Sequence, residues 1–182
     1  MFEALGTRIM VGVISLSMLL FSSFKGNDPQ LGTINHYSSS STLYLSGELL
    51  SAFDNDFDTV FASSATIPVY FTLKIKSGNR NVVNRQFKHL VKFNPATGIY
   101  ELRKDGKPDV FRSSSMQQIV KEISQYSFSV PYQSSWGLIS VSVQAEMPIV
   151  RFEELNKEVD LMVLWKYKKP SAKIQIDLRK AQ

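Results

Sequence analysis

Residues 136–147, WGLISVSVQAEM, are the stretch that decides the fold of this chain. Apolar side chains alternate there with polar ones without a break; the apolar ones are Ile139, Val141, Val143, Ala145 and Met147. Successive side chains of an extended chain point to opposite faces, so this alternation predicts a half-buried β-strand. Residues 69–75 repeat the pattern, with Lys74 on the polar side. The sequence therefore predicts at least two strands that each have one apolar and one polar face.

Weaker patterns extend this interpretation to the rest of the chain. Turn-bounded or alternating segments predict further strands at residues 43–45, 87–93, 99–103 and 172–178. Apolar residues at helical spacing predict helices over residues 49–64 and 116–123, the second with a serine cap at Ser113–Ser115 and Gln117 or Gln118 completing a capping box. Residues 151–159 are predicted to hold a turn of helix, and residues 159–167 fit both a strand and a buried helix.

These elements define a fold class. About six strands, mostly joined as hairpins, and two or three amphipathic helices predict an α+β fold with a mostly antiparallel sheet. The length of 182 residues and the hydrophobic content of 43% are sufficient for one domain with a real core. We expect that single α+β domain at residues 43–180.

The first part of the chain is predicted to direct export. An uncharged apolar run fills residues 9–24 between Arg8 and Lys25, which is typical of a signal peptide or a membrane anchor at residues 1–26. Both interpretations remain open: Ser22, Ser23 and Gly26 are small, as a cleavage site requires, but the bulky residues Leu20, Phe21 and Phe24 occupy the paired upstream positions and make the site a poor one. Residues 27–42 are rich in Ser, Gly and Asn and are predicted to be a linker. The domain would then lie in the periplasm, or be anchored in the inner membrane and face the periplasm.

Charge is distributed unevenly along the chain, whose net charge is +5. Lys74 and Lys76 share the polar face of one predicted strand, and Lys88 and Lys92 share the polar face of its expected neighbour. If these strands pair, the lysines form a basic sheet face with Tyr70 at its edge. Anionic lipid headgroups or an acidic envelope protein are the partners that such a face predicts. Nucleic acid is not expected as a partner outside the cytoplasm, and membrane contact through residues 1–26 is expected if that segment is uncleaved.

The acidic run Asp54, Asp56 and Asp58 invites a calcium interpretation, since alternate carboxylates can converge on one ion. An EF-hand loop also needs Gly at its sixth position and Glu at its twelfth. Those positions hold Thr59 and Ala65, so the acids are interpreted as a solvated helix face.

Catalytic motifs are scarce. The chain has no cysteine, which excludes disulfides, thiolate nucleophiles and Cys-ligated zinc. His36 and His89 are the only histidines and lie far apart in the sequence, and no Gly-x-Ser-x-Gly elbow, glycine-rich phosphate loop or HExxH motif occurs. The adjacent acids Glu153 and Glu154 are interpreted as surface residues. We therefore predict a protein that is not an enzyme and has no cofactor and no metal.

Four loose features of the sequence resemble a known family. They are the helix leading into a strand over residues 57–76, the motif Asn94-x-x-Thr97-Gly98-x-Tyr100, the strand-to-helix segment 111–123, and Leu164–Trp165 before the last strand. Over about residues 42–179 the chain resembles an uncharacterised family of exported bacterial proteins, the domain of unknown function 4390. A Leu-Pro pair regular in that family corresponds here to Met147–Pro148. The resemblance implies a location in the cell envelope and supplies no catalytic residues.

Two functional hypotheses follow. The first is a binding or interaction module on the outer side of the inner membrane, which would use an exposed strand edge, the basic sheet face or a groove between helix and sheet. The alternative is a carrier of a small apolar ligand or lipid, in which the aromatic-rich helix over residues 53–61 covers a cavity.

Overall fold

The computed structural model describes residues 25–39 and 41–179 of the chain. The signal peptide or anchor predicted at residues 1–26 therefore lies almost entirely outside the described residues. Within the described part, no helix is both long enough and apolar enough to cross a membrane.

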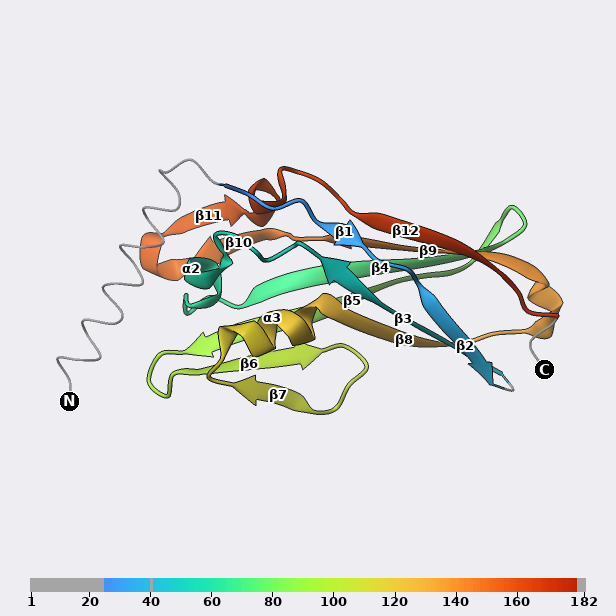
Figure 1. Ribbon diagram of the computed structural model, residues 1–182, viewed down its shortest axis with the longest axis horizontal. Coiled ribbons are helices and arrows are strands. Elements are labelled where there is room, and N and C mark those ends of the chain that lie inside the picture. Colours follow the sequence, from blue (N-terminus) through green and yellow to red (C-terminus); the bar gives the residue numbers. More distant parts are fainter. Residues whose placement is uncertain (1–24, 40, 180–182) are drawn as a thin grey trace.

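A six-stranded antiparallel sheet forms one layer of the molecule (Figure 1). Its strand order is β12-β9-β4-β5-β6-β7. The bounds are β4 Ile67–Ser77, β5 Arg80–Asn94, β6 Ile99–Lys104, β7 Val110–Ser113, β9 Leu138–Glu146 and β12 Ser171–Asp177. Consecutive strands from β4 to β7 are joined as hairpins, whereas β9, which follows α3 and β8 in the chain, returns to pair with β4. The prediction of a mostly antiparallel sheet is confirmed.

A smaller, four-stranded sheet crosses the first one (Figure 1). It consists of β1 Gln30–Leu31, β2 Asn35–Ser39, β3 Thr42–Leu50 and β8 Gln125–Pro131. Residues 42–46 of β3 pair with both β2 and β8, so those two strands lie on opposite edges of β3. Helix α3 Met116–Ser124 leads directly into β8 and packs over β6. The remaining elements are α2 Phe57–Phe61, the hairpin of β10 Ile149–Phe152 with β11 Lys157–Asp160, and the short helices η1 Ser134–Trp136, η2 Glu153–Leu155 and η3 Leu161–Trp165.

The core lies where the apolar faces of the two sheets meet. The alternating residues of β4 and β9 that point inward are at most 1% exposed: Val69, Phe71, Leu73, Ile75, Ile139, Val141, Val143 and Ala145. Burying each Val, Leu, Ile or Phe side chain among them contributes roughly 1.5–3 kcal/mol. The inward residues of β3 and β8 meet them from the other side, and Phe71 contacts the ring of Tyr126 with centroids 5.3 Å apart. The alternation in the sequence thus predicted both strands and their buried faces correctly.

The linker predicted at residues 27–42 is wrong, because β1 and β2 belong to the smaller sheet. Asn27 is 2% exposed, and its side-chain amide donates to the carbonyl oxygens of Asn55 and Leu164 at 3.0 and 3.1 Å. Small polar residues are common in linkers, but they also suit an edge strand whose backbone bonds are supplied by a neighbour. Here that neighbour is β3.

The helix predicted over residues 49–64 is also mostly wrong. Strand β3 continues to Leu50, and only Phe57–Phe61 are helical. Ser51 and Asp56 have φ values of 50° and 68°, a left-handed backbone that interrupts a right-handed helix. The apolar spacing that indicated a helix reflects instead a cluster of aromatic side chains brought together by bends.

Several other segments differ from the expectation. The chain from 125 to 131 forms β8, which was not predicted, although Tyr126, Phe128 and Val130 alternate. Within residues 151–159, the predicted turn of helix is present as the 3-10 helix η2, while the residues on either side of it belong to the β10–β11 hairpin. The ambiguous stretch 159–167 contains the buried 3-10 helix η3. Helix α3 is confirmed, and its cap is Ser115, whose side chain accepts a hydrogen bond from the Gln118 backbone N–H.

The contact between Gly47 and Tyr126 joins β3 to β8 and gives a test of the smaller sheet. A Cβ atom on residue 47 would lie 2.3 Å from the hydroxyl oxygen of Tyr126 and 2.6 Å from its Cζ. We expect Gly47→Ala to lower the free energy of unfolding by about 1–3 kcal/mol through overpacking. Urea denaturation measures this. The loss should be smaller in a Tyr126→Phe background, which lacks the hydroxyl, and an equal loss in both backgrounds would contradict the packing argument.

Candidate functional site

The predicted basic face lies on the outer, solvent-exposed side of the six-stranded sheet. Strands β4 and β5 pair as expected, with Tyr70 opposite Lys88 and with Lys74 opposite Asn84. Lys74, Lys76, Lys88 and Lys92 are all exposed on this side. At about 3.4 Å per residue, however, Lys88 lies about 14 Å along the strand from the level of Lys74, and Lys92 lies about 27 Å from it. The five predicted residues share one face but do not form one cluster.

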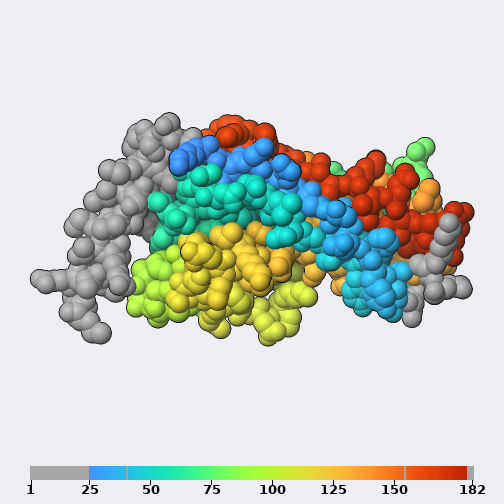
Figure 2. Space-filling model, viewed as in Figure 1, coloured from blue at the N-terminus to red at the C-terminus, as the bar shows by residue number. Residues whose placement is uncertain are grey.

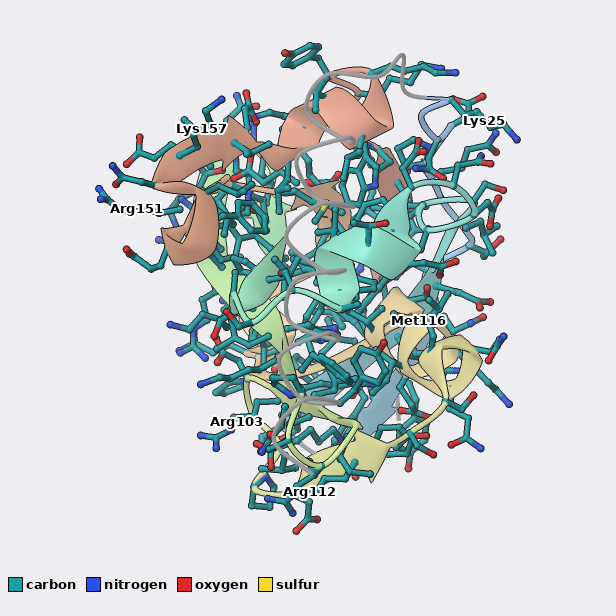
Figure 3. All side chains as sticks on the ribbon, turned by 90° about the vertical axis from the view of Figure 1, so that its left-hand side faces the viewer. Lys25, Arg103, Arg112, Met116, Arg151 and Lys157 are labelled. Carbon is teal, nitrogen blue, oxygen red and sulfur yellow. The ribbon has the colours of Figure 1, made fainter. Side chains whose placement is uncertain are left out.

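Every carboxylate on the outer face has a basic partner. Glu101 receives a hydrogen bond from Arg112 at 2.8 Å, which holds the pKa of this carboxyl below its usual value. Arg103 lies 3.8 Å from the same carboxylate, and Figure 3 shows Arg103 and Arg112 at the same border of the molecule. The other two pairs are Glu146 with Lys169 at 2.6 Å and Asp177 with Arg179 at 2.8 Å.

Among the described residues, no ion pair involves the outer-face lysines Lys74, Lys76, Lys88 and Lys173. Lys88 lies apart from the other three, which are close together. Lys74 and Lys173 flank Ser142, because β9 pairs Ser142 with Lys74 on one side and with Lys173 on the other. Lys76 lies two residues further along β4. We call Lys74, Lys76 and Lys173 the lysine cluster; among the described residues none of the three has an ion-pair partner. Lys92, by contrast, is directly opposite Glu101.

The sequence missed Lys173. It lies in the last strand, which was predicted, but nothing in the sequence says that this strand pairs with β9. The register that places it beside Ser142 is visible only in the structure.

A second candidate site is a groove along β8. Two connected hollows of about 680 and 430 Å³ share Asn35, Ser46, Asp105, Lys107 and Ser127 in their walls. One wall is the loop between β6 and β7, and the other consists of β2, β3 and β8, with Arg85 and Phe87 of β5 beneath. Figure 2 shows the recess between the yellow-green loop and the blue strands of the smaller sheet. We call this the β8 groove.

His89 and Tyr126 lie at the bottom of the β8 groove. His89 is 3% exposed, and its Nδ1 donates to the carbonyl oxygen of Ile123 at 3.0 Å. Burial lowers the pKa of His89 to about 4. The hydroxyl of Tyr126 has no hydrogen-bond partner within the described chain, and burial raises its pKa to about 12. Both side chains are therefore neutral at neutral pH.

The cavity that a lipid carrier would need beneath residues 53–61 is filled by side chains. The ring centroid of Phe53 lies 4.8 Å from that of Phe57, 5.6 Å from that of Phe61 and 6.1 Å from that of Trp165. The four side chains are between 0 and 7% exposed. Because these rings contact one another directly, they act as core rather than as a lid.

The remaining candidate residues lie apart. His36 is exposed on β2, while His89 is buried below β8. Asp54 lies in the bend that precedes α2, and Asp58 lies in the first turn of α2. Asp56 accepts a hydrogen bond from the backbone N–H of Gly26 at 3.1 Å. In the described ranges, no group of three or more histidine and acidic side chains is arranged to hold a metal ion.

Comparison with known proteins gives no assignment: no family model, curated protein or solved structure matches this chain. The fold is thus defined by its own geometry, an α+β sandwich of a six-stranded and a four-stranded sheet. The resemblance to the exported bacterial family stays a prediction.

The buried histidine predicts a pH dependence of stability. In the unfolded chain His89 takes up its proton near pH 6.5, but in the folded protein only near pH 4. Between these two pH values the unfolded state therefore binds more protons than the folded state. The contribution of neutral His89 to the free energy of unfolding is complete above about pH 6.5 and is lost as the pH falls toward 4. We expect a loss on the order of 3 kcal/mol. Urea unfolding at pH 7.5, 5.5 and 4.5 measures it.

His89→Phe should remove this part of the pH dependence, whereas the exposed His36→Asn should keep it. Carboxylates also titrate at the lower end of the range, so the comparison is between variants at each pH. A wild-type slope that survives in His89→Phe would contradict the assignment.

Proposed function

We propose that this protein is a non-enzymatic binding module of the cell envelope, on the outer side of the inner membrane, and that its lysine cluster binds anionic lipid headgroups. The proposal is carried by one observation: within the described part of the chain, Lys74, Lys76 and Lys173 have no carboxylate partner, on a face whose described carboxylates are already paired. Lysines near an anionic surface each contribute about 1 kcal/mol of attraction.

The surroundings of the lysine cluster support this proposal. The strand pairing places Ser140 and Ser142 of β9 between β4 and β12, so short side chains separate the lysines. Strands two places apart are separated by about 9–10 Å, which leaves room for a headgroup phosphate between Lys74 and Lys173. An anchor at residues 1–26, expected from the sequence if that segment is uncleaved, would hold the domain near a membrane.

Vesicle flotation of the full chain tests the proposal. We compare vesicles of phosphatidylcholine alone with vesicles that also contain phosphatidylglycerol. The double variant Lys74→Glu and Lys173→Glu should partition about 30-fold less onto the anionic vesicles, since at least two attractions of about 1 kcal/mol are lost. Its partition onto neutral vesicles should not change.

The matched control is Lys107→Glu with Lys121→Glu, which changes net charge equally but lies off the outer sheet face. It should lose much less anionic binding. An N-terminal apolar segment that entered bilayers by itself would raise recovery on both vesicle types alike, so the difference between them is the quantity to measure. Equal losses in the two double variants would refute a role for the lysine cluster.

A further inference from the structure

Strand β8 has one edge that no neighbouring strand covers. The backbone N–H of Tyr132 donates to the carbonyl of Ser41 at 2.8 Å, which fixes the alternation of the β3–β8 ladder. Val130, Phe128 and Tyr126 then bond to β3, because hydrogen-bonded pairs recur at every second residue. The backbone groups of Ser127 and Ser129 point to the opposite edge. Within the described chain, nothing bonds to them there.

The start of this edge is occupied. Lys104 Nζ donates to the carbonyl of Gln125 at 3.4 Å and to Glu122 at 3.0 Å. The free part of the edge therefore begins at Ser127. It opens into the β8 groove, whose hollows both include Ser127 and one of which includes Ser129.

The groove offers an apolar floor beside this edge. Phe128 points inward from β8 and stacks on Phe87 of β5, with ring centroids 4.3 Å apart and an interplanar angle of 23°. Phe87 is only partly buried and lines the groove. An extended chain paired with β8 would place the side chain opposite Phe128 on the same inward face, against these rings.

Two cations lie near this floor without an acidic partner. Arg85 precedes Phe87 by two residues and so shares its face, and Lys107 lies on the loop that forms the other wall. Both are exposed, and in the part of the chain that the structure describes neither forms an ion pair. Asp105, the acid on the same wall, accepts a hydrogen bond from the backbone N–H of Lys88 at 3.1 Å.

We propose that the β8 groove binds an extended segment of a partner protein by strand addition to the free edge of β8. The segment bonds to the backbone of Ser127 and Ser129, sets an apolar side chain on Phe87 and Phe128, and carries an acidic side chain two positions away toward Arg85 and Lys107. Backbone pairing supplies affinity in this mode, and alternate side chains supply specificity. The site is independent of the lysine cluster, since it uses none of its residues.

The test selects peptides against the full-length protein. A phage-displayed library of random dodecapeptides is the probe, with counter-selection on Ser127→Pro/Ser129→Pro. Proline is compatible with an edge position whose N–H faces away from the neighbouring strand, so β3–β8 pairing should survive. We expect enriched peptides with an apolar and an acidic residue two positions apart. Failure to enrich any peptide would overturn the proposal.

Two measurements then locate the bound peptide. An enriched peptide should bind about fivefold or more weakly for each backbone hydrogen bond removed, both in the proline variant and when alternate peptide nitrogens are methylated against wild-type protein. The methylated peptide needs no protein variant, so it remains informative if a proline disturbs folding. Ser38→Pro, at the free edge of β2, is the matched control and should bind normally.

Hydrogen exchange of the full-length protein measures directly whether the backbone amides on the free edge of β8 are hydrogen-bonded. The amides of Ser127 and Ser129 should become protected when peptide saturates the protein. Binding without protection, or binding insensitive to N-methylation, would refute strand addition. If the protein forms concentration-dependent dimers that disappear in the proline variant, the edge binds a second copy of this chain instead. If peptide binding is lost in Lys74→Glu/Lys173→Glu but not in the proline variant, the peptide binds at the lysine cluster, and strand addition to β8 is refuted.

Discussion

The register of β4 against β5 and β9 is the constraint on which the rest of the molecule depends. With the observed pairing, Phe71 and Leu73 face Ala145 and Val143 across the inner side of the sheet. A slip by one residue would turn Lys74 and Lys76 into the core and bring the apolar set to the surface. Burying unpaired ammonium groups is far more costly than leaving them in water. The dry core and the lysines on the outer face are therefore two consequences of one register.

Strands with strict alternation, as in residues 69–75 and 139–147, could be predicted from the sequence because alternate residues define the apolar and the polar face. Their partners could not. The pairing of β12 with β9 depends on contacts between segments far apart in the chain. The sequence alone therefore could not place Lys173 close to Lys74. Residues 49–64 show the opposite failure: spacing at Leu49, Phe53 and Phe57 fits a helix, yet left-handed backbone at Ser51 and Asp56 divides the segment.

The groove arises because the two layers differ in width. Six strands form one sheet, whereas the other has four strands, β1, β2 and β8 each pairing with β3. The narrower sheet therefore ends over β5, where Phe87 remains only partly covered. Sequence alone could not find this site, since β8 was not predicted and an unpaired strand edge consists of backbone, which every residue carries. The alternation of Tyr126, Phe128 and Val130 could have revealed the strand β8 itself, but not that one of its edges is unpaired.

An open edge is normally a liability, since it can pair with any exposed strand. Here the junction between α3 and β8 limits it. His89 binds the carbonyl of Ile123, and Lys104 binds that of Gln125, so the acceptors before Ser127 are already taken. The loop carrying Asp105 and Lys107 then restricts access from the other side. A short, recessed edge admits a single extended segment far more easily than the broad edge of another sheet, so the features that protect the strand from aggregation also define what it can bind.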